Sequence, residues 1–196
     1  MRPLPNADPW LERHIDALRL AGRRVLEVGC GPGTDAAFLA ANGFEVVAFD
    51  RANPGRAALG TGPAWVLADA TALPFRARSF DAAVASLSLH YLPWAETARV
   101  FREVGDLLEQ GGALLFRVNA SDDVNHGAGQ GEEVEPGFFR VPGEAGFWSE
   151  TKRFFSEQAV RAVLPAGFEI EVLEHRTITR FREPKQVWEC RARRLT

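Results

Sequence analysis

Residues 25–50 constrain the fold of this chain more than any other part of the sequence. They begin as a short apolar strand, turn through three alternate glycines at Gly29, Gly31 and Gly33, and continue with the alanine and leucine content of a helix. A second predicted strand follows and ends in Asp50, whose carboxylate can bind a ribose diol. Glycines let the backbone approach a ligand, and a helix N-terminus supplies N–H donors. This order predicts an α/β fold with a site for a nucleotide-like ligand.

Two ligand classes use such a turn, and the charge around it separates them. Proteins that bind NAD or flavins prefer a glycine at the position of Thr34, where it lets the helix pack closely on the strand. Glu27, two places before Gly29, repels a pyrophosphate and attracts an ammonium group. S-adenosylmethionine has an ammonium group, a ribose diol and no phosphate. The pattern favours this methyl donor, with an NAD(P)-dependent oxidoreductase of the Rossmann type as the alternative.

Further motifs follow in the order that the same ligand requires. Asp69 and Ala70 come directly after a third predicted strand, where a carboxylate and a backbone N–H can bind an adenine edge. Asp69 can alternatively cap a short helix. A fourth apolar strand opens into a loop that contains Ser86, His90 and Tyr91, and a Gly-Gly turn then leads into a fifth strand.

The motifs EVGCGPG, the strand-end aspartate, DAxxLPF and LxxGG, in this order, resemble those of the class I S-adenosylmethionine-dependent methyltransferases over residues 23–119. The general likeness is to small methyltransferase type 11-like and tellurite-resistance-like enzymes. The resemblance implies a Rossmann-like, doubly wound sheet of seven strands, mostly parallel, with an antiparallel last strand. It also implies S-adenosylmethionine as cofactor, with Glu27, Gly29, Cys30, Gly31 and Gly33 at the methionine end, Asp50 and Arg51 at the adenosine, Asp69 and Ala70 at the adenine, and Ser86 and Leu87 in the pocket wall.

The predicted elements alternate along the chain, which indicates a parallel sheet with helices on both faces. We expect one methyltransferase domain over 1–196, made of an N-terminal helix cap (1–22), a cofactor-binding core (23–118), a lid or insert (119–150), and a C-terminal helix with a β-hairpin (151–196). Predicted strands cover 24–28, 45–50, 64–68, 80–86, 112–118, 168–178 and 186–193, and predicted helices cover 8–20, 34–42, 53–60, 94–109 and 156–164.

Residues 119–150 show no periodicity of their own, and a loop of this length is usually functional or disordered. Their first part is rich in glycine and acidic residues, whereas their second part contains several aromatic residues, Phe139 and Trp148 among them. Because the segment follows the fifth strand at the carboxyl edge of the sheet, we interpret it as a substrate lid. Its aromatic residues then offer contact area to an uncharged or planar acceptor. Alternatively, they complete the core.

Methyl transfer from a sulfonium depends mainly on alignment of the reactants. If the acceptor must lose a proton, His90 is the candidate general base, because it follows the fourth strand, and its neighbour Tyr91 can orient the substrate. A loop histidine satisfied by the backbone is the alternative. Trp10 and His14, on the opening helix, are candidates to close over the donor.

Composition narrows the class of partner. The chain has 196 residues, 46% of them hydrophobic, and a net charge of −3, which disfavours a strongly cationic nucleic-acid surface. Its two cysteines suggest neither a disulfide framework nor a metal cluster, so we expect a cytoplasmic protein, and no apolar run is long enough to cross a bilayer. Asp122, Asp123 and His126 are predicted to lie in a solvated acidic loop, with a cation site as the alternative, and we expect no metal. We therefore expect a small-molecule acceptor, with a non-catalytic donor-binding protein as another alternative. The oligomeric state is not predicted.

Overall fold

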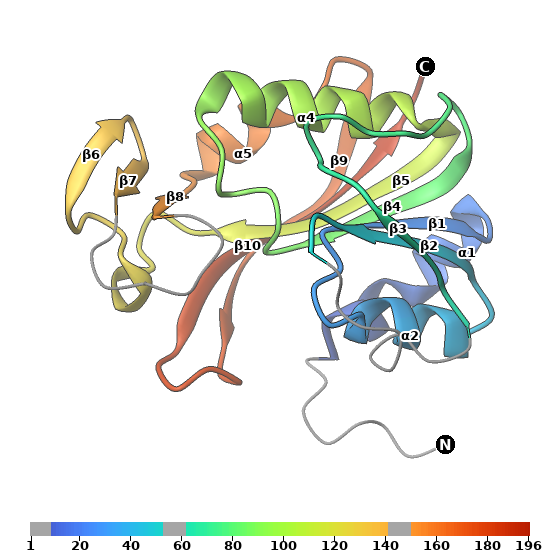
Figure 1. Cartoon of the computed structure of the whole chain (residues 1–196), viewed down its shortest axis with the longest axis horizontal. Helices are drawn as coiled ribbons and strands as arrows, with labels where there is room; N and C mark the ends of the chain where they lie inside the picture. The colour runs from blue at the N-terminus through green and yellow to red at the C-terminus, as the bar shows by residue number, and fades with distance from the viewer. Residues whose placement is uncertain (1–8, 53–61, 141–149) are drawn as a thin grey trace.

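A computed structural model of the protein describes residues 9–52, 62–140 and 150–196. A seven-stranded sheet lies at its centre, with the strand order β3-β2-β1-β4-β5-β10-β9 (Figure 1). Neighbouring strands from β3 to β5 are parallel, while β10 runs antiparallel to both β5 and β9. This confirms the predicted mostly parallel sheet with an antiparallel last strand. The strands are β1 (Arg24–Val28), β2 (Glu45–Asp50), β3 (Ala64–Leu67), β4 (Phe80–Ser86), β5 (Leu108–Asn119), β9 (Phe168–Ile178) and β10 (Lys185–Arg194).

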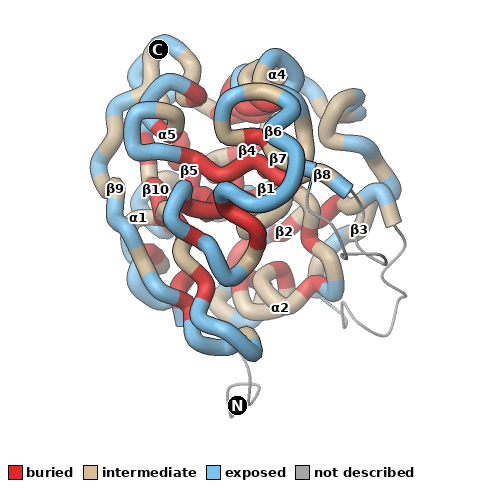
Figure 2. Tube along the Cα trace, turned by 90° about the vertical axis from the view of Figure 1, so that its left-hand side faces the viewer, coloured by how far each residue is buried: buried red, intermediate tan, exposed pale blue. Residues whose placement is uncertain are grey.

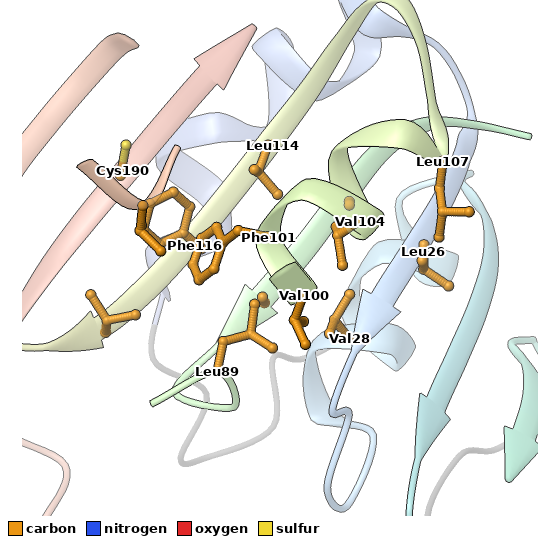
Figure 3. Close-up of a cluster of buried hydrophobic side chains, with 14 of the residues drawn as sticks. Leu26, Val28, Leu89, Val100, Phe101, Val104, Leu107, Leu114, Phe116 and Cys190 are labelled. Atoms are coloured by element: carbon orange, nitrogen blue, oxygen red, sulfur yellow. The ribbon is translucent and has the colours of Figure 1, made fainter. Parts of the chain in front are cut away.

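Helices cover both faces of the sheet, because side chains along each strand point alternately to opposite faces. Leu26 and Val28 pack with Val100 of α4 (Trp94–Asp106) in one core cluster, which also contains residues of α5 (Glu157–Val163) (Figure 3). Between these two strand residues, Glu27 points the other way, toward the ligand side of the turn. A second cluster, on the opposite face, joins η1 (Pro9–His14), α1 (Ile15–Ala21) and α2 (Thr34–Ala41) to the sheet.

Burial is concentrated along the central strands β4 and β5, whereas the edge strand β9 is intermediate or exposed over most of its length (Figure 2). The most buried part of the sheet is therefore its middle, and residues of the edge strands β3 and β9 pack against the two clusters only in partly buried positions. None of the helices among the described residues combines the length and the apolar character that crossing a bilayer requires.

The opening helix differs from the prediction in its first half, which is a 3-10 helix. This geometry places residues three apart in line, and both Leu11 and His14 are buried there. The predicted helix over 53–60 lies outside the described residues. The fifth strand begins at Leu108 and includes the predicted Gly-Gly turn, and its pairing with β4 shifts register between Phe80 and Ala82. The glycines are thus part of an irregular strand start.

The prediction that 119–150 lacks regular structure was wrong for its described part. After a short 3-10 turn, η2 (Val124–His126), the chain forms the three-stranded antiparallel sheet of β6 (Glu132–Glu135), β7 (Phe138–Arg140) and β8 (Thr151–Arg153). The glutamate-rich β6 has no apolar alternation, so its sequence gives no strand signal. Pairing with β7 defines it as a strand.

Candidate functional site

A cavity of about 540 Å³ lies at the carboxyl edge of the large sheet, where open α/β folds bind ligands. Its walls come from the loops after β1, β2, β3 and β4, together with β8 and the turn between β9 and β10. Twelve of the sequence-predicted site residues line it, namely Glu27, Gly29, Cys30, Gly31, Asp50, Arg51, Asp69, Ala70, Ser86, Leu87, His90 and Tyr91. Gly33 adopts a positive φ of 79° at the start of α2 and is outside this lining.

The glycine turn after β1 forms the floor of the cavity. Gly29 has a φ of 68°, and a Cβ atom at this position would lie only 2.4 Å from Cβ of Ser88. Gly31 has a φ of 49°, but a Cβ atom there would meet no described atom within 4 Å. Gly29 is therefore required for close packing against the loop after β4, whereas the space beside Gly31 is open to a ligand.

Glu27 is the most unusual charged group of the cavity. Its side chain is buried, and its Oε2 has no hydrogen-bond partner among the described residues. Burial, reinforced by the charges of Asp35 and Asp50, raises the pKa of this carboxyl well above its usual value, although a hydrogen bond from the backbone of Ala36 opposes the shift. A cationic ligand group here would satisfy the buried oxygen and restore the charged form.

Asp50 links the end of β2 to the glycine turn. Its Oδ2 accepts a hydrogen bond from the N–H of Gly31 at 2.9 Å, and its Oδ1 accepts one from the N–H of Ala52 at 3.0 Å. Each carboxylate oxygen has a second acceptor site, so the group can bind hydroxyls while it holds the loop in place. The residue is half-buried at the cavity wall, which is the position that a ribose-binding carboxylate requires.

For Asp69 the sequence left two roles open, capping of a turn and contact with a ligand, and its position suits both. Its Oδ1 accepts hydrogen bonds from the N–H of Thr71 at 2.8 Å and from its hydroxyl at 2.7 Å, as in a capped turn. These bonds, the one from the backbone first, lower the pKa of the carboxyl. Both bonds fall on the same oxygen, and the residue also lines the cavity beside Ala70. Turn formation and ligand contact are therefore compatible here.

The loop after β4 is held by a buried cation that sequence reasoning missed. Arg117, on β5, donates to the Ser86 hydroxyl oxygen from Nε at 3.2 Å and from Nη2 at 2.7 Å. The next residue, Leu87, has a φ of 56°, in the left-handed region that bulky side chains rarely adopt. Strained backbone of this kind is typical of binding sites.

Trp10 and His14 do not close over the cavity as we expected. Trp10 is fully buried, its ring lies 4.2 Å from the Arg117 guanidinium, and its Nε1 donates to Asp35 Oδ2 at 3.0 Å. His14 is also buried and contacts Glu189 through Nε2 at 2.9 Å. Both side chains are therefore directed into the interior. Trp10 belongs to the core cluster that includes α2 and contacts Asp35 and Arg117, whereas His14 is held by Glu189.

His90 lines the cavity as a buried imidazole that burial and two nearby lysines keep neutral. It is buried, and its Nδ1 has no hydrogen-bond partner among the described residues. Burial lowers the pKa of the imidazole well below its usual value, and the nearby charges of Lys185 and Lys152 add to this effect. Its ring centroid lies 4.3 Å from that of Tyr91. A neutral imidazole at neutral pH can accept a proton.

Other predicted residues have different surroundings. Phe139 packs against Phe154 at 6.1 Å between ring centroids and is outside the cavity lining, while Trp148 lies outside the described residues. Asp123 is fully buried, contrary to the predicted solvated loop, because it pairs with His126 and Lys185 at 2.9 Å each. Burial raises the pKa of the Cys30 thiol to about 12, so this lining thiol is not a nucleophile at neutral pH.

The structure adds a basic wall that the sequence interpretation missed. This basic wall consists of four lining residues, namely Lys152, Arg180, Lys185 and His126. Phe181 lines the cavity beside them. Arg180, Phe181 and Lys185 lie in or beside the turn between β9 and β10, which we had interpreted only as a hairpin connection. The antiparallel pairing of β10 with β5 returns this turn to the carboxyl edge of the sheet. In the sequence, only the basic and aromatic residues of this turn indicated that it could line a ligand cavity.

Sheet order, glycine turn and strand-end carboxylates together define a class of Rossmann-like proteins that bind an adenosine ligand with a cationic tail. Residues 26–116 match the family model of a methyltransferase domain. On this match and the fold, the chain is similar to the class I S-adenosylmethionine-dependent methyltransferases, in agreement with its motifs.

Individual relatives and solved structures agree with this placement. The chain is 37% identical over 103 residues to the demethylmenaquinone methyltransferase of Clavibacter sepedonicus, covering 50% of this chain and 41% of that protein. It is 33% identical over 120 residues to the malonyl-[acyl-carrier protein] O-methyltransferase of Enterobacter lignolyticus, covering 57% and 47%. The chain thus matches about half the length of these relatives. The fold resembles that of a methyltransferase from Methanosarcina mazei, with a TM-score of 0.76, 22% identity and coverage of 92% and 96%.

Proposed function

We propose that this protein is an S-adenosylmethionine-dependent methyltransferase that acts on a small-molecule acceptor. The observation that carries the proposal is the buried Glu27 oxygen without a hydrogen-bond partner among the described residues, in a cavity that also contains Asp50 and the open space beside Gly31. An isolated buried carboxylate is costly, and an ammonium group of a bound ligand removes this cost. The volume of about 540 Å³ is typical of small-molecule sites.

Each lining segment has a role in this proposal. Glu27 binds the ammonium group of the donor, Asp50 binds the ribose hydroxyls, and Asp69 with the backbone of Ala70 binds the adenine. When bound, S-adenosylmethionine supplies a methyl group already activated for in-line displacement. The residues of the cavity then need only align the acceptor and exclude water.

His90 is the proposed proton acceptor for an acceptor that must lose a proton. Its imidazole is kept neutral by burial, and Tyr91 packs against its ring. An N–H or O–H of the acceptor within hydrogen-bond reach of His90 would transfer its proton to the imidazole as the methyl bond forms. This role applies only to acceptors that react in a deprotonated form.

Names of relatives support the small-molecule class, because demethylmenaquinone and ubiquinone-pathway methyltransferases are among them. The net charge of −3 supports the same class over nucleic acid. Cys30 and Cys190 are both free and buried, which supports a reducing compartment. We therefore also propose that the protein is cytoplasmic.

Thermal unfolding with separate ligands tests donor binding. S-adenosylmethionine and S-adenosylhomocysteine should raise the melting temperature, and NAD should not. At one hundred times its dissociation constant, a ligand adds about 2.7 kcal/mol to the free energy of unfolding, which is readily measured. Stabilisation by NAD alone would contradict the proposal. Release of S-adenosylhomocysteine during incubation with the donor and a metabolite extract separates an enzyme from a non-catalytic binder.

A further inference from the structure

The charged residues of the cavity are divided between its two sides. Among the described lining residues, all the carboxylates come from β1, β2 or the segments that follow β1 and β3, namely Glu27, Asp50, Asp35 and Asp69. These strands form one half of the sheet. Arg51 is the basic lining residue on that half. The donor side of the cavity is therefore predominantly acidic, which suits a cationic donor.

The opposite side is basic. Lys152 lies on β8, Lys185 begins β10, and Arg180 and His126 come from the neighbouring turns. The position of Lys185 follows from the sheet, because Val187 pairs with Asn119 and so places the start of β10 just beyond the end of β5. No carboxylate lines this side within the described part of the chain.

Lys152 is brought beside the reacting end of the cavity by a backbone contact. The N–H of Arg153 donates to the carbonyl oxygen of His90 at 2.7 Å, which attaches β8 to the loop after β4. Lys152 precedes Arg153 on the same strand and is buried in the cavity wall. The contact therefore places a cationic side chain of the small sheet in the cavity wall near His90.

One buried carboxylate lies behind this wall. Asp123 accepts from Lys185 Nζ at 2.9 Å and from the N–H of Gln186 at 2.9 Å, and it pairs with His126 at 2.9 Å. It thereby fixes Lys185 in place. An ammonium group has three N–H donors, so a second anion can bind to a lysine already held by one carboxylate.

Aromatic surface accompanies these cations. The Arg180 guanidinium lies 5.1 Å from the centroid of the Phe181 ring, and Lys185 Nζ lies 5.8 Å from it. Phe181 and Tyr91 both line the cavity. This side therefore offers apolar contact for a ring or chain next to groups that bind an anion.

We propose that the methyl acceptor carries an anionic group, a carboxylate or a phosphate, which Lys152, Lys185 and Arg180 bind at the side of the cavity opposite the donor. This inference rests on the proposed function and adds the charge of the acceptor to it. It differs from the sequence-based expectation of an uncharged or planar acceptor in the charge alone. The neutral state of His90 agrees with it, because the two lysines that would bind the anion also disfavour the imidazolium.

Three probes with the same ring test the proposal. Benzoate, phenyl phosphate and benzamide are titrated separately into the protein saturated with S-adenosylhomocysteine, and their dissociation constants are measured by ligand-observed NMR. We expect at least one anionic probe to bind ten times more tightly than benzamide. The comparison of benzoate with phenyl phosphate decides between the two anions.

Substitutions in the basic wall test whether its residues cause the preference for an anionic probe over benzamide. Lys152→Gln and Arg180→Gln should each reduce the preference for the anionic probe at least threefold, with an unchanged dissociation constant for S-adenosylhomocysteine. Lys152→Arg keeps the charge and should keep the preference. Arg182→Gln removes an exposed charge of the same turn outside the cavity lining and serves as the matched control. Lys185 is left intact because it is the partner of buried Asp123.

Equal affinity for benzamide and both anions, or a preference that survives in both glutamine variants, would overturn the inference while the proposed function stands. Failure of the wild-type protein to bind S-adenosylhomocysteine would instead overturn the proposed function. A lower melting temperature of Lys152→Gln identifies misfolding, and the exposed Arg180 then provides the decisive variant.

Discussion

The buried carboxyl of Glu27, on the proposed donor side, reduces the stability of the ligand-free protein at neutral pH. Glu27 is held in the core between the apolar residues of β1, close to the charges of Asp35 and Asp50. Its folded-state pKa is above the usual 4.5, so the folded protein binds this proton more readily than the unfolded chain. The contribution of Glu27 to stability therefore falls as the pH rises above about 4.5.

Glu27→Gln should make the ligand-free protein more stable at pH 7 and weaken donor binding. A neutral amide avoids the desolvation of a charge, but it cannot pair with the ammonium group, and loss of that charged bond costs about 1.5–3 kcal/mol. Melting temperatures at pH 5 and pH 8, and calorimetric titration with S-adenosylhomocysteine, measure both effects. Glu45→Gln, at an exposed position, is the control. Unchanged donor affinity would show that Glu27 does not contact the ligand.

Asp50→Ala should weaken donor binding by about 1.5–3 kcal/mol for each charge-assisted bond that is lost. The fold should survive, because the residue lies at a strand end and not in the core. The variant also frees the N–H groups of Gly31 and Ala52, so the glycine turn should become more mobile. Isothermal titration and circular dichroism provide the two readouts. Wild-type affinity or an unfolded protein would each argue against a ribose-binding role.

Among the elements, the small sheet is attached to the large one through a few polar contacts. Arg153 of β8 is buried between the rings of Trp94 and Phe138, at 5.4 and 4.9 Å, and burial lowers the pKa of its guanidinium to about 10. Glu135 of β6 pairs with Arg153 and also accepts from the N–H of Trp94 at the start of α4. One glutamate thus connects the small sheet to a helix of the main core.

Glu135→Ala should lower the free energy of unfolding by about 1–3 kcal/mol, because it removes the carboxylate partner of the buried Arg153 guanidinium and the acceptor of the Trp94 N–H. Urea unfolding followed by circular dichroism measures the change. Glu132→Ala on the same strand removes only an exposed pair with Arg140 and should cost less than about 1 kcal/mol. Equal effects of the two variants would show that the Glu135 contact is not a structural anchor.

Elements of the main sheet could be predicted because their signals are local. The central strands are mostly apolar, and the donor-side motifs lie at or directly after the ends of β1, β2 and β3. Strand β6 could not be predicted, since its four residues are mostly glutamate and its structure depends on β7. The basic wall could not be predicted either, because Lys152 and Lys185 meet only after β10 has paired with β5.

At the scale of the whole molecule, the two ends of the described chain meet at Glu189. This buried residue of β10 accepts from Arg13 Nη2 at 2.8 Å and contacts His14 Nε2 at 2.9 Å. Burial alone would raise the pKa of its carboxyl, but the hydrogen bonds and charges of His14 and Arg13 outweigh burial and lower the pKa. The contribution of this group to stability is therefore present above its usual pKa of 4.5 and is lost as the pH falls through the lower folded-state value.

Glu189→Gln should destabilise the protein at pH 7. It should also make the free energy of unfolding less dependent on pH in the acidic range. The difference in free energy of unfolding between wild type and variant should shrink as the pH is lowered from about 4.5. Urea unfolding at pH 7, 5, 4 and 3.5 measures this difference. Glu171→Gln, on the edge strand β9, removes a more exposed ion pair and serves as control. If the difference in free energy of unfolding stayed constant over this pH range, protonation of Glu189 would not be coupled to stability.

The contact between His14 and Glu189 spans 175 residues. Synthesis proceeds from the N-terminus, so α1 leaves the ribosome long before β10 exists. Strand β9 must likewise wait, because β10 lies between it and β5. Trp10, which supports Asp35 and Arg117 beneath the donor cavity, belongs to the same late-anchored segment. A nascent chain can therefore form the strands that carry the predicted donor motifs early, but the segment that supports them from beneath is anchored only after β10 has been synthesised.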